Sequence, residues 1–246
     1  MIAATLRTIT GRKGSFIGGT AVVLASVLVV IVVIVVVHEL RPGRNPSIGG
    51  QPLLNGVGGA VWLFGIVVGI LIGALAGSYD VAQGTMRYLV ITGARRSQIY
   101  GARTVALILA VLLMLAVPVA VGGLAALVLP HTAADTIEAG EIADYVWTIV
   151  VYTAVFALIS MGIGSVMRSN GPAIAISLVF SIGFTPLLLI VYSVSETLGS
   201  LTLIGSLDRI TGGDPGLAIP VSALSTVAWV VIFWTAGWLR VRHDEY

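Results

Sequence analysis

The chain has 246 residues, of which 57% are hydrophobic and only 10% are charged, and its mean hydropathy is +1.05. Soluble globular domains carry about 25% charged residues, so this composition indicates an integral membrane protein. The formal net charge of +2 argues against nucleic-acid binding, and the absence of cysteine excludes disulfides and thiolate metal sites.

Six apolar segments follow one another along the chain, and we expect each to cross the membrane as an α-helix. Because they use nearly all of the sequence, no room remains for a separate soluble domain of about 100 residues. We therefore expect a single all-α transmembrane domain over residues 1–246. The expected spans are about 15–37, 53–76, 104–129, 145–167, 173–193 and 217–239.

The first segment, 15–37, follows three basic residues and is rich in Val and Ile. A secretory signal has an apolar region of about 7 to 15 residues and a small-residue cleavage site. This segment is longer, and the polar sequence HELRPGR follows it. We interpret it as an uncleaved first span, followed by a loop with several Pro and Gly residues.

The second segment, 53–76, contains a row of glycines at a strict spacing of four. That spacing places the row on one helix face, where the missing side chains allow another helix to come close. Two interpretations remain open, packing within the chain and a seam between two subunits. The row consists of Gly65, Gly69, Gly73 and Gly77.

The segment from Gly77 to Arg103 is polar and lies between two long apolar segments, so it must sit at a membrane surface. It contains an acid, then Gly-Thr and a base, and further on Gly-x-x-Arg and a closing base. This pattern resembles type-2 exporter permeases of the ATP-binding-cassette (ABC) superfamily, although it has Asp80 where Glu is commoner, an extra base at Arg95, and Arg103 where Lys is usual. The pattern is carried by Asp80, Gly84, Thr85, Arg87, Leu89, Gly93, Arg96, Ile99 and Arg103.

The resemblance implies that residues 77–103 form a cytoplasmic coupling helix, which docks into a groove on a separate ATPase subunit. It also implies a second permease subunit, identical or paralogous, with ATP and Mg bound by the ATPase and no cofactor bound by this chain. The plain alternative is that the arginines only fix the orientation of the chain in the membrane. By resemblance the charged contacts are Asp80, Arg87, Arg95 and Arg96, the close-approach or turn positions are Gly84 and Gly93, and the apolar contacts are Tyr88, Ile91 and Ile99.

A polar loop follows the third span and holds one histidine and four acids. These residues could suggest a metal site, but the spacing of three between successive acids also suits a short exposed helix, which we favour. Residues 194–217 are semi-apolar and too short to span, so they form either a re-entrant or interfacial hairpin or a plain loop. The loop residues are His131, Asp135, Glu138, Glu141 and Asp144.

The basic residues predict the orientation of the six spans. Ten of the thirteen Lys and Arg residues precede the first span, lie in 77–103, form the turn after the fourth span, or follow the sixth. Only Arg41, Arg44 and Arg209 lie in the opposite loops. By the positive-inside rule, both termini and residues 77–103 are cytoplasmic in a multi-pass protein of the plasma membrane.

The six apolar segments contain no Asp, Glu, Lys, Arg or His, so the sequence offers no proton relay within the membrane. It also lacks a phosphate-binding G-x-x-x-x-G-K-[ST] loop and any Ser-His-Asp or HExxH pattern. We therefore expect no catalytic residue and no metal site in this chain. The expected function is that of a permease subunit that exports a drug, peptide or lipid with energy from a separate ATPase.

The alternative is a six-span scaffold without a transport role, whose basic loop binds anionic lipid. A passive channel is disfavoured, because no ring of polar or charged pore-lining residues is apparent in the spans.

Overall fold

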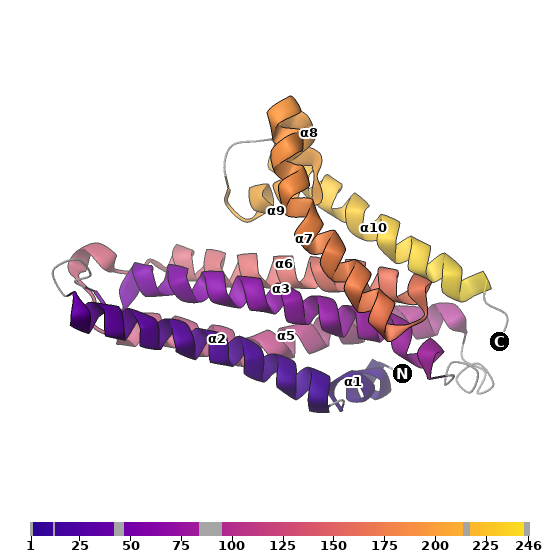
Figure 1. Ribbon diagram of the computed structural model, residues 1–246, viewed down its shortest axis with the longest axis horizontal. Helices are drawn as coiled ribbons and strands as arrows, with labels where there is room; N and C mark the ends of the chain where they lie inside the picture. The colour runs from indigo at the N-terminus through magenta and orange to yellow at the C-terminus, as the bar shows by residue number, and fades with distance from the viewer. Residues whose placement is uncertain (1, 12, 42–46, 84–94, 214–216, 244–246) are drawn as a thin grey trace.

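A computed structural model describes the chain except residues 1, 12, 42–46, 84–94, 214–216 and 244–246, and its described residues form helices and no strand (Figure 1). The predicted all-α class is therefore confirmed. The helices are α1 (Ile2–Thr10), α2 (Lys13–Leu40), α3 (Gly50–Ala82), α5 (Arg96–Val128), the 3₁₀ turn η1 (Ala133–Asp135), α6 (Ala139–Met167), α7 (Asn170–Val194), α8 (Glu196–Leu201), α9 (Leu203–Ile210) and α10 (Ile219–His243).

Five of these helices are long and apolar enough to cross a membrane, so the protein is of the multi-pass membrane type. They overlap five of the six predicted spans. The candidate segments are Gly14–Leu40, Gly50–Tyr79, Arg96–Val128, Ala139–Met167 and Ile219–His243. The remaining predicted span, 173–193, falls within α7, of which Asn170–Ser181 is the described apolar part.

The helices extend beyond the apolar segments because polar residues can begin a helix. At the start of α6, the Glu138 carboxylate accepts from a backbone N–H of the first turn, while the backbone N–H of Glu138 donates to the Glu141 carboxylate at 2.9 Å. This reciprocal cap starts α6 before the apolar segment predicted at 145. Pro52, the last proline of the loop predicted after the first span, instead lies in the first turn of α3, where a missing N–H leaves no helix bond unmade.

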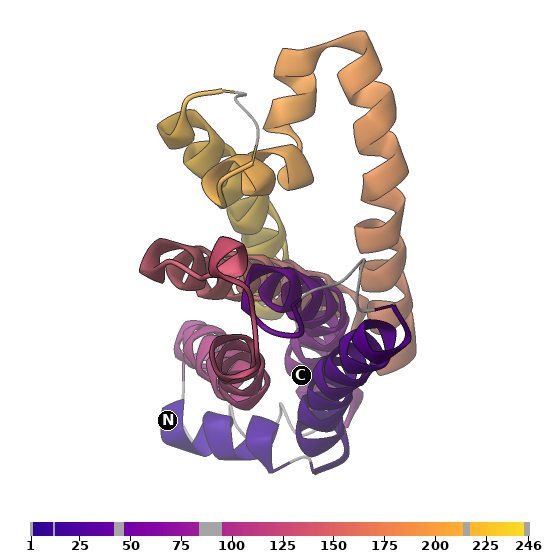
Figure 2. The same ribbon diagram turned by 90° about the vertical axis from the view of Figure 1, so that its left-hand side faces the viewer.

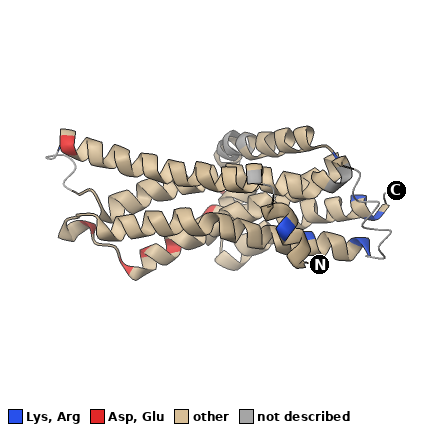
Figure 3. Ribbon diagram, turned by 90° about the horizontal axis from the view of Figure 1, so that it is seen from below, with Lys and Arg blue, Asp and Glu red and all other residues tan. Residues whose placement is uncertain are grey.

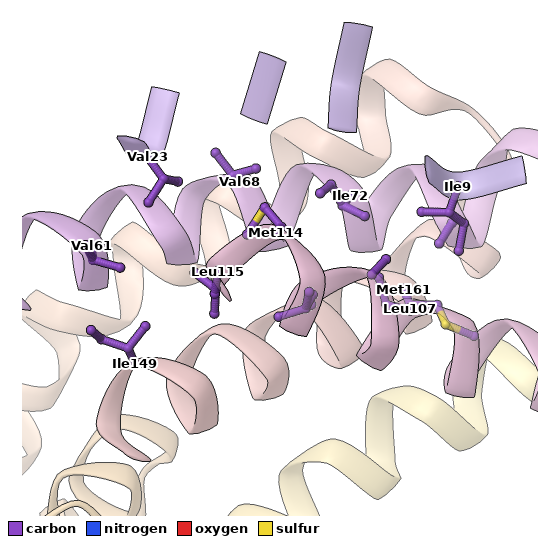
Figure 4. Close-up of a cluster of buried hydrophobic side chains, with 14 of the residues drawn as sticks. Ile9, Val23, Val61, Val68, Ile72, Leu107, Met114, Leu115, Ile149 and Met161 are labelled. Atoms are coloured by element: carbon purple, nitrogen blue, oxygen red, sulfur yellow. The ribbon is translucent and has the colours of Figure 1, made fainter. Parts of the chain in front are cut away.

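Helices α2, α3, α5 and α6 lie side by side along the long axis of the molecule (Figure 1). Their facing sides form a dry cluster of Val, Ile, Leu and Met side chains, to which α1 adds Ile9 (Figure 4). Helix α6 lies at the centre, with 67% of its most apolar stretch buried, against 17% for α2 and 11% for α10. The outer helices therefore expose most of their apolar residues, as expected of helices that face lipid.

The glycine row on α3 packs against α6 of the same chain. A methyl group added to Gly69 would lie 2.8 Å from the Thr153 methyl carbon, and one added to Gly73 or Gly77 would overlap backbone carbonyls of α6. From the other side, a methyl group on Gly164 would overlap the Ala74 carbonyl. Because α6 occupies this face, a second subunit could reach the row only by displacing α6.

Helices α7 to α10 form an arch beside the bundle (Figure 2). Helix α7 leans away from the bundle, α8 and α9 turn back toward α6, and α10 packs on α6 and α9. Residues 194–217 thus contain two short helices rather than a plain loop. Thr202 separates them and caps α9 by accepting from Gly205 N at 3.2 Å, and Leu203 and Leu207 of α9 are fully buried.

Charge is segregated along the molecule (Figure 3). Most Lys and Arg residues gather at the end that holds both termini, which we call the basic end. Asp and Glu residues lie at the opposite end, the acidic end, and toward the middle.

Candidate functional site

A cleft lined by three acidic residues, which we call the acidic cleft, opens between α3, α6 and α9 in the half of the molecule nearer the acidic end. Its volume is about 460 Å³, within the range of small-molecule pockets. Helix α3 contributes Gln51, Leu54, Asn55, Gly58, Gly59 and Trp62, helix α6 contributes Glu141, Asp144, Tyr145, Thr148, Ile149 and Tyr152, and Asp208 and Thr211 close it from α9 and its end. The lining therefore combines three carboxylates with aromatic and aliphatic walls, and no Lys or Arg belongs to it among the described residues.

Helix α9 is joined to α6 at the cleft by a side-chain hydrogen bond. The Tyr152 hydroxyl donates to Oδ1 of Asp208, and the Tyr152 ring meets the Trp62 ring edge to face, with the ring centroids 5.6 Å apart. Partial burial raises the pKa of the Asp208 carboxyl, while the hydrogen bond from Tyr152 acts in the opposite direction. The neighbouring base points elsewhere, because the Arg209 guanidinium donates to the carbonyls of Leu217 at 3.1 Å and Gly213 at 3.3 Å.

The loops at the acidic end are joined by a small polar cluster. Thr132 Oγ1 donates to Oδ2 of Asp135 at 2.6 Å, the Ser47 hydroxyl donates to the same oxygen, and Thr132 N donates to Ser47 Oγ at 3.0 Å. Hydrogen bonds to the charged form lower the pKa of Asp135 below its ordinary value of 3.8. In the described part of the chain, no three His, Asp or Glu side chains come together in a way that could hold a metal ion.

A second hollow, of about 450 Å³, lies at the basic end, where α5 begins beside the last turns of α10. Arginine side chains surround an apolar floor formed by Trp238 and Val241. Arg96 Nη1 donates to the Arg242 carbonyl at 3.0 Å, and the Arg242 guanidinium lies over the Trp238 ring, 5.4 Å from its centroid. Arg95 precedes α5 and is exposed, and its side chain makes no capping bond.

The predicted coupling residues fall into three groups. Gly84, Thr85, Arg87, Tyr88, Leu89, Ile91 and Gly93 lie outside the described residues, as does the side chain of Asp80, near the end of α3. Arg95 and Arg96 line the basic hollow. Ile99 and Arg103 are 3% and 2% exposed, so their side chains lie inside the protein rather than on a surface that a partner could contact.

Sequence reasoning missed the acidic cleft. Tyr152 and Asp208 are separated by 56 residues, and no local pattern predicts that α9 folds back onto α6. One signal was present, since Glu141, Asp144, Tyr145, Thr148 and Tyr152 place polar atoms along one side of the predicted fourth span at helical spacing.

Comparison with known proteins adds no assignment: no protein-family model matches the chain, and no curated protein matches it. The resemblance to ABC exporter permeases therefore rests on the pattern within residues 77–103 and on the layout of apolar segments.

Proposed function

We propose that the chain is the transmembrane permease subunit of an ATP-driven ABC exporter. The observation that carries the proposal is the basic hollow at the start of α5, which Arg95 and Arg96 line. Arg95 and Arg96 there belong to the family-like pattern, and an exposed cationic surface beside an apolar floor suits docking to an acidic groove. The cationic surface and the apolar floor both lie at the basic end, which is the end that a soluble ATPase would contact in this function.

The proposed topology has six spans, with α7 as the fifth. Helix α7 has 25 residues, which corresponds to a length of about 37 Å and exceeds the roughly 30 Å of a hydrocarbon core. With six spans both termini lie on one side, and the positive-inside rule makes the basic end cytoplasmic. The acidic cleft and the α8–α9 hairpin then lie in the outer half of the protein.

In this function, ATP and Mg are bound by the partner ATPase, and its closure displaces the coupling segment of each of two permease subunits. The spans then reorient and release a hydrophobic or amphipathic cargo outward. The glycine face of α3 is filled by α6, so the second subunit meets a different face of the chain. The lipid-facing sides of α2 and α10 remain exposed and apolar.

Charge reversal at the basic hollow tests the proposal. Arg95→Glu places a like charge against an acidic groove at a partly desolvated contact, which costs on the order of 2 to 5 kcal/mol of association free energy. We expect this variant to insert and fold normally but to lose co-purification with the ATPase and permease-stimulated ATP hydrolysis. Arg96→Glu should act similarly, with an added loss of the bond to the Arg242 carbonyl.

The matched control is Arg41→Glu, an exposed reversal just after α2 at the acidic end. Arg209 is not a suitable control, because its guanidinium donates to two backbone carbonyls and a charge reversal there would also perturb the fold. If Arg95→Glu and Arg96→Glu both match wild type in association and turnover, the coupling assignment is wrong. Binding to anionic vesicles that is lost at high salt, without any ATPase association, would favour the scaffold function instead.

A further inference from the structure

We propose that the cleft between α3, α6 and α9 binds an organic cation with an apolar body, and that such a cation is the cargo class of the exporter. The role as cargo rests on the proposed function, whereas the binding site does not. The inference is drawn from the charge balance of the cleft, its aromatic wall and its unfilled volume.

The charge balance selects a cation. Glu141, Asp144 and Asp208 line the cleft together, and among the residues that the structure describes no Lys or Arg joins them. The nearest base along the chain, Arg209, is held by backbone carbonyls and lines a different hollow, between α7, α8 and α9. An anion entering the cleft would meet three carboxylates and no compensating charge from the described lining, so the site discriminates by sign.

The walls select an apolar body on that cation. Trp62 is 37% exposed and presents its ring at the cleft beside Tyr152, while Leu54 and Ile149 supply aliphatic surface. Aromatic faces attract ammonium and phosphonium groups, and they do so most strongly where water is partly excluded. A small hydrated metal ion would leave these walls unused.

A substitution at Gly59 gives the most direct test of whether a ligand occupies the cleft. A methyl group added there meets no atom within 4 Å, although the residue lines the cleft, so a larger side chain would fill the cleft without disturbing the packing of α3. Gly123 of α5 also has open space around it but lies outside the cleft lining. Gly59→Leu and Gly123→Leu are therefore a matched pair with the same chemical change.

The experiment measures binding of tetraphenylphosphonium to the full purified chain in a nonionic detergent by equilibrium dialysis, with empty micelles as background. Tetraphenylborate, which has the same shape and the opposite charge, is the second probe. We expect saturable binding of the cation alone, at least a tenfold loss of affinity in Gly59→Leu, and wild-type affinity in Gly123→Leu. Asp144→Asn, at an exposed position, should weaken binding about tenfold, as expected for one ion pair in a partly solvated cleft.

Saturable binding of tetraphenylborate with equal affinity, or cation binding that is unchanged in both Gly59→Leu and Asp144→Asn, would overturn the inference. Thermal unfolding of each variant separates loss of binding from loss of fold. The assay contains no ATPase, so its result is independent of coupling. A permease that stimulates its ATPase but does not bind the cation in this cleft would refute the inference and leave the proposed function intact.

Discussion

Asp135 shows how a single carboxylate can join two loops that are far apart in sequence. It accepts hydrogen bonds from Ser47, in the connection before α3, and from Thr132, in the connection after α5. The backbone strengthens the junction, since Ile48 N and Gly49 N donate to the Pro130 carbonyl at 3.0 and 2.8 Å. The acidic end is therefore closed by a junction whose strength depends on one ionised group.

The stability contributed by this junction should depend on pH. The pKa of Asp135 is lower in the folded chain than its ordinary value of 3.8, so the ionised carboxylate stabilises the fold above pH 3.8. That contribution is lost as the pH falls through the lower, folded-state pKa. We expect the difference in unfolding temperature between wild type and Asp135→Asn to shrink when thermal unfolding is measured at pH 3 rather than pH 6.

Ser47→Ala is the companion variant for this measurement. It removes one donor to Asp135 and leaves Thr132 N without its acceptor, so it should lower the unfolding temperature at pH 6. The pH dependence should weaken in this variant as well. An unchanged pH dependence in both variants would show that other groups control acid stability.

At the scale of the helices, replacing glycine with alanine should have opposite effects on stability inside and outside the contact between α3 and α6. Gly73→Ala forces a methyl group onto the Ala157 carbonyl in the seam, and overpacking of this kind typically costs about 1 to 3 kcal/mol. Gly123→Ala meets open space near the C-terminal end of α5 and should gain up to about 1 kcal/mol from helix propensity. Thermal unfolding in detergent measures both, and destabilisation by Gly123→Ala equal to that by Gly73→Ala would contradict the seam.

The sequence predicted the helices better than their ends and their partners. Apolar segments of more than 20 residues identify spans because a buried backbone must bond to itself, so the five described spans follow from hydropathy alone. The spacing of four among the α3 glycines revealed a close contact but not whether its partner was α6 or another subunit, since both offer a backbone to approach.

The functional sites were harder to predict because they depend on contacts between distant segments. The amphipathic helix α1 was missed, since its nine residues are too few for a strong periodic signal, yet Ile9 is buried in the core. Trp234 donates from its indole to Thr104 Oγ1 at 2.9 Å and so joins α10 to α5, two helices that are 130 residues apart at this contact. The carboxylate of Asp208 reaches the cleft only because α9 docks on α6.

At the scale of the whole molecule, the predicted orientation can be tested directly because the chain has no native cysteine. Ser97 and Ala134 are both exposed, one near the start of α5 at the basic end and the other in η1 at the acidic end. We expect an impermeant thiol reagent to label Ala134→Cys on intact cells and to label Ser97→Cys only after the cells are opened. The reverse pattern would invert the topology and place the acidic cleft on the cytoplasmic side.

The seam between α3 and α6 also has a mechanical consequence. Along Gly69, Gly73 and Gly77 the backbones of α3 and α6 are in contact, and few side chains lie between them that could change rotamer. The two helices therefore move together as one rigid body. Helix α3 alone has 33 residues and is about 50 Å long, with Ala82 at one end and Gly59 and Trp62 toward the other. A displacement at the basic end therefore arrives at the cleft as tilt or translation rather than bending. The cleft can then change shape only by movement of α9, because α9 is joined to α6 through the side chains of Asp208 and Tyr152 rather than by backbone contact.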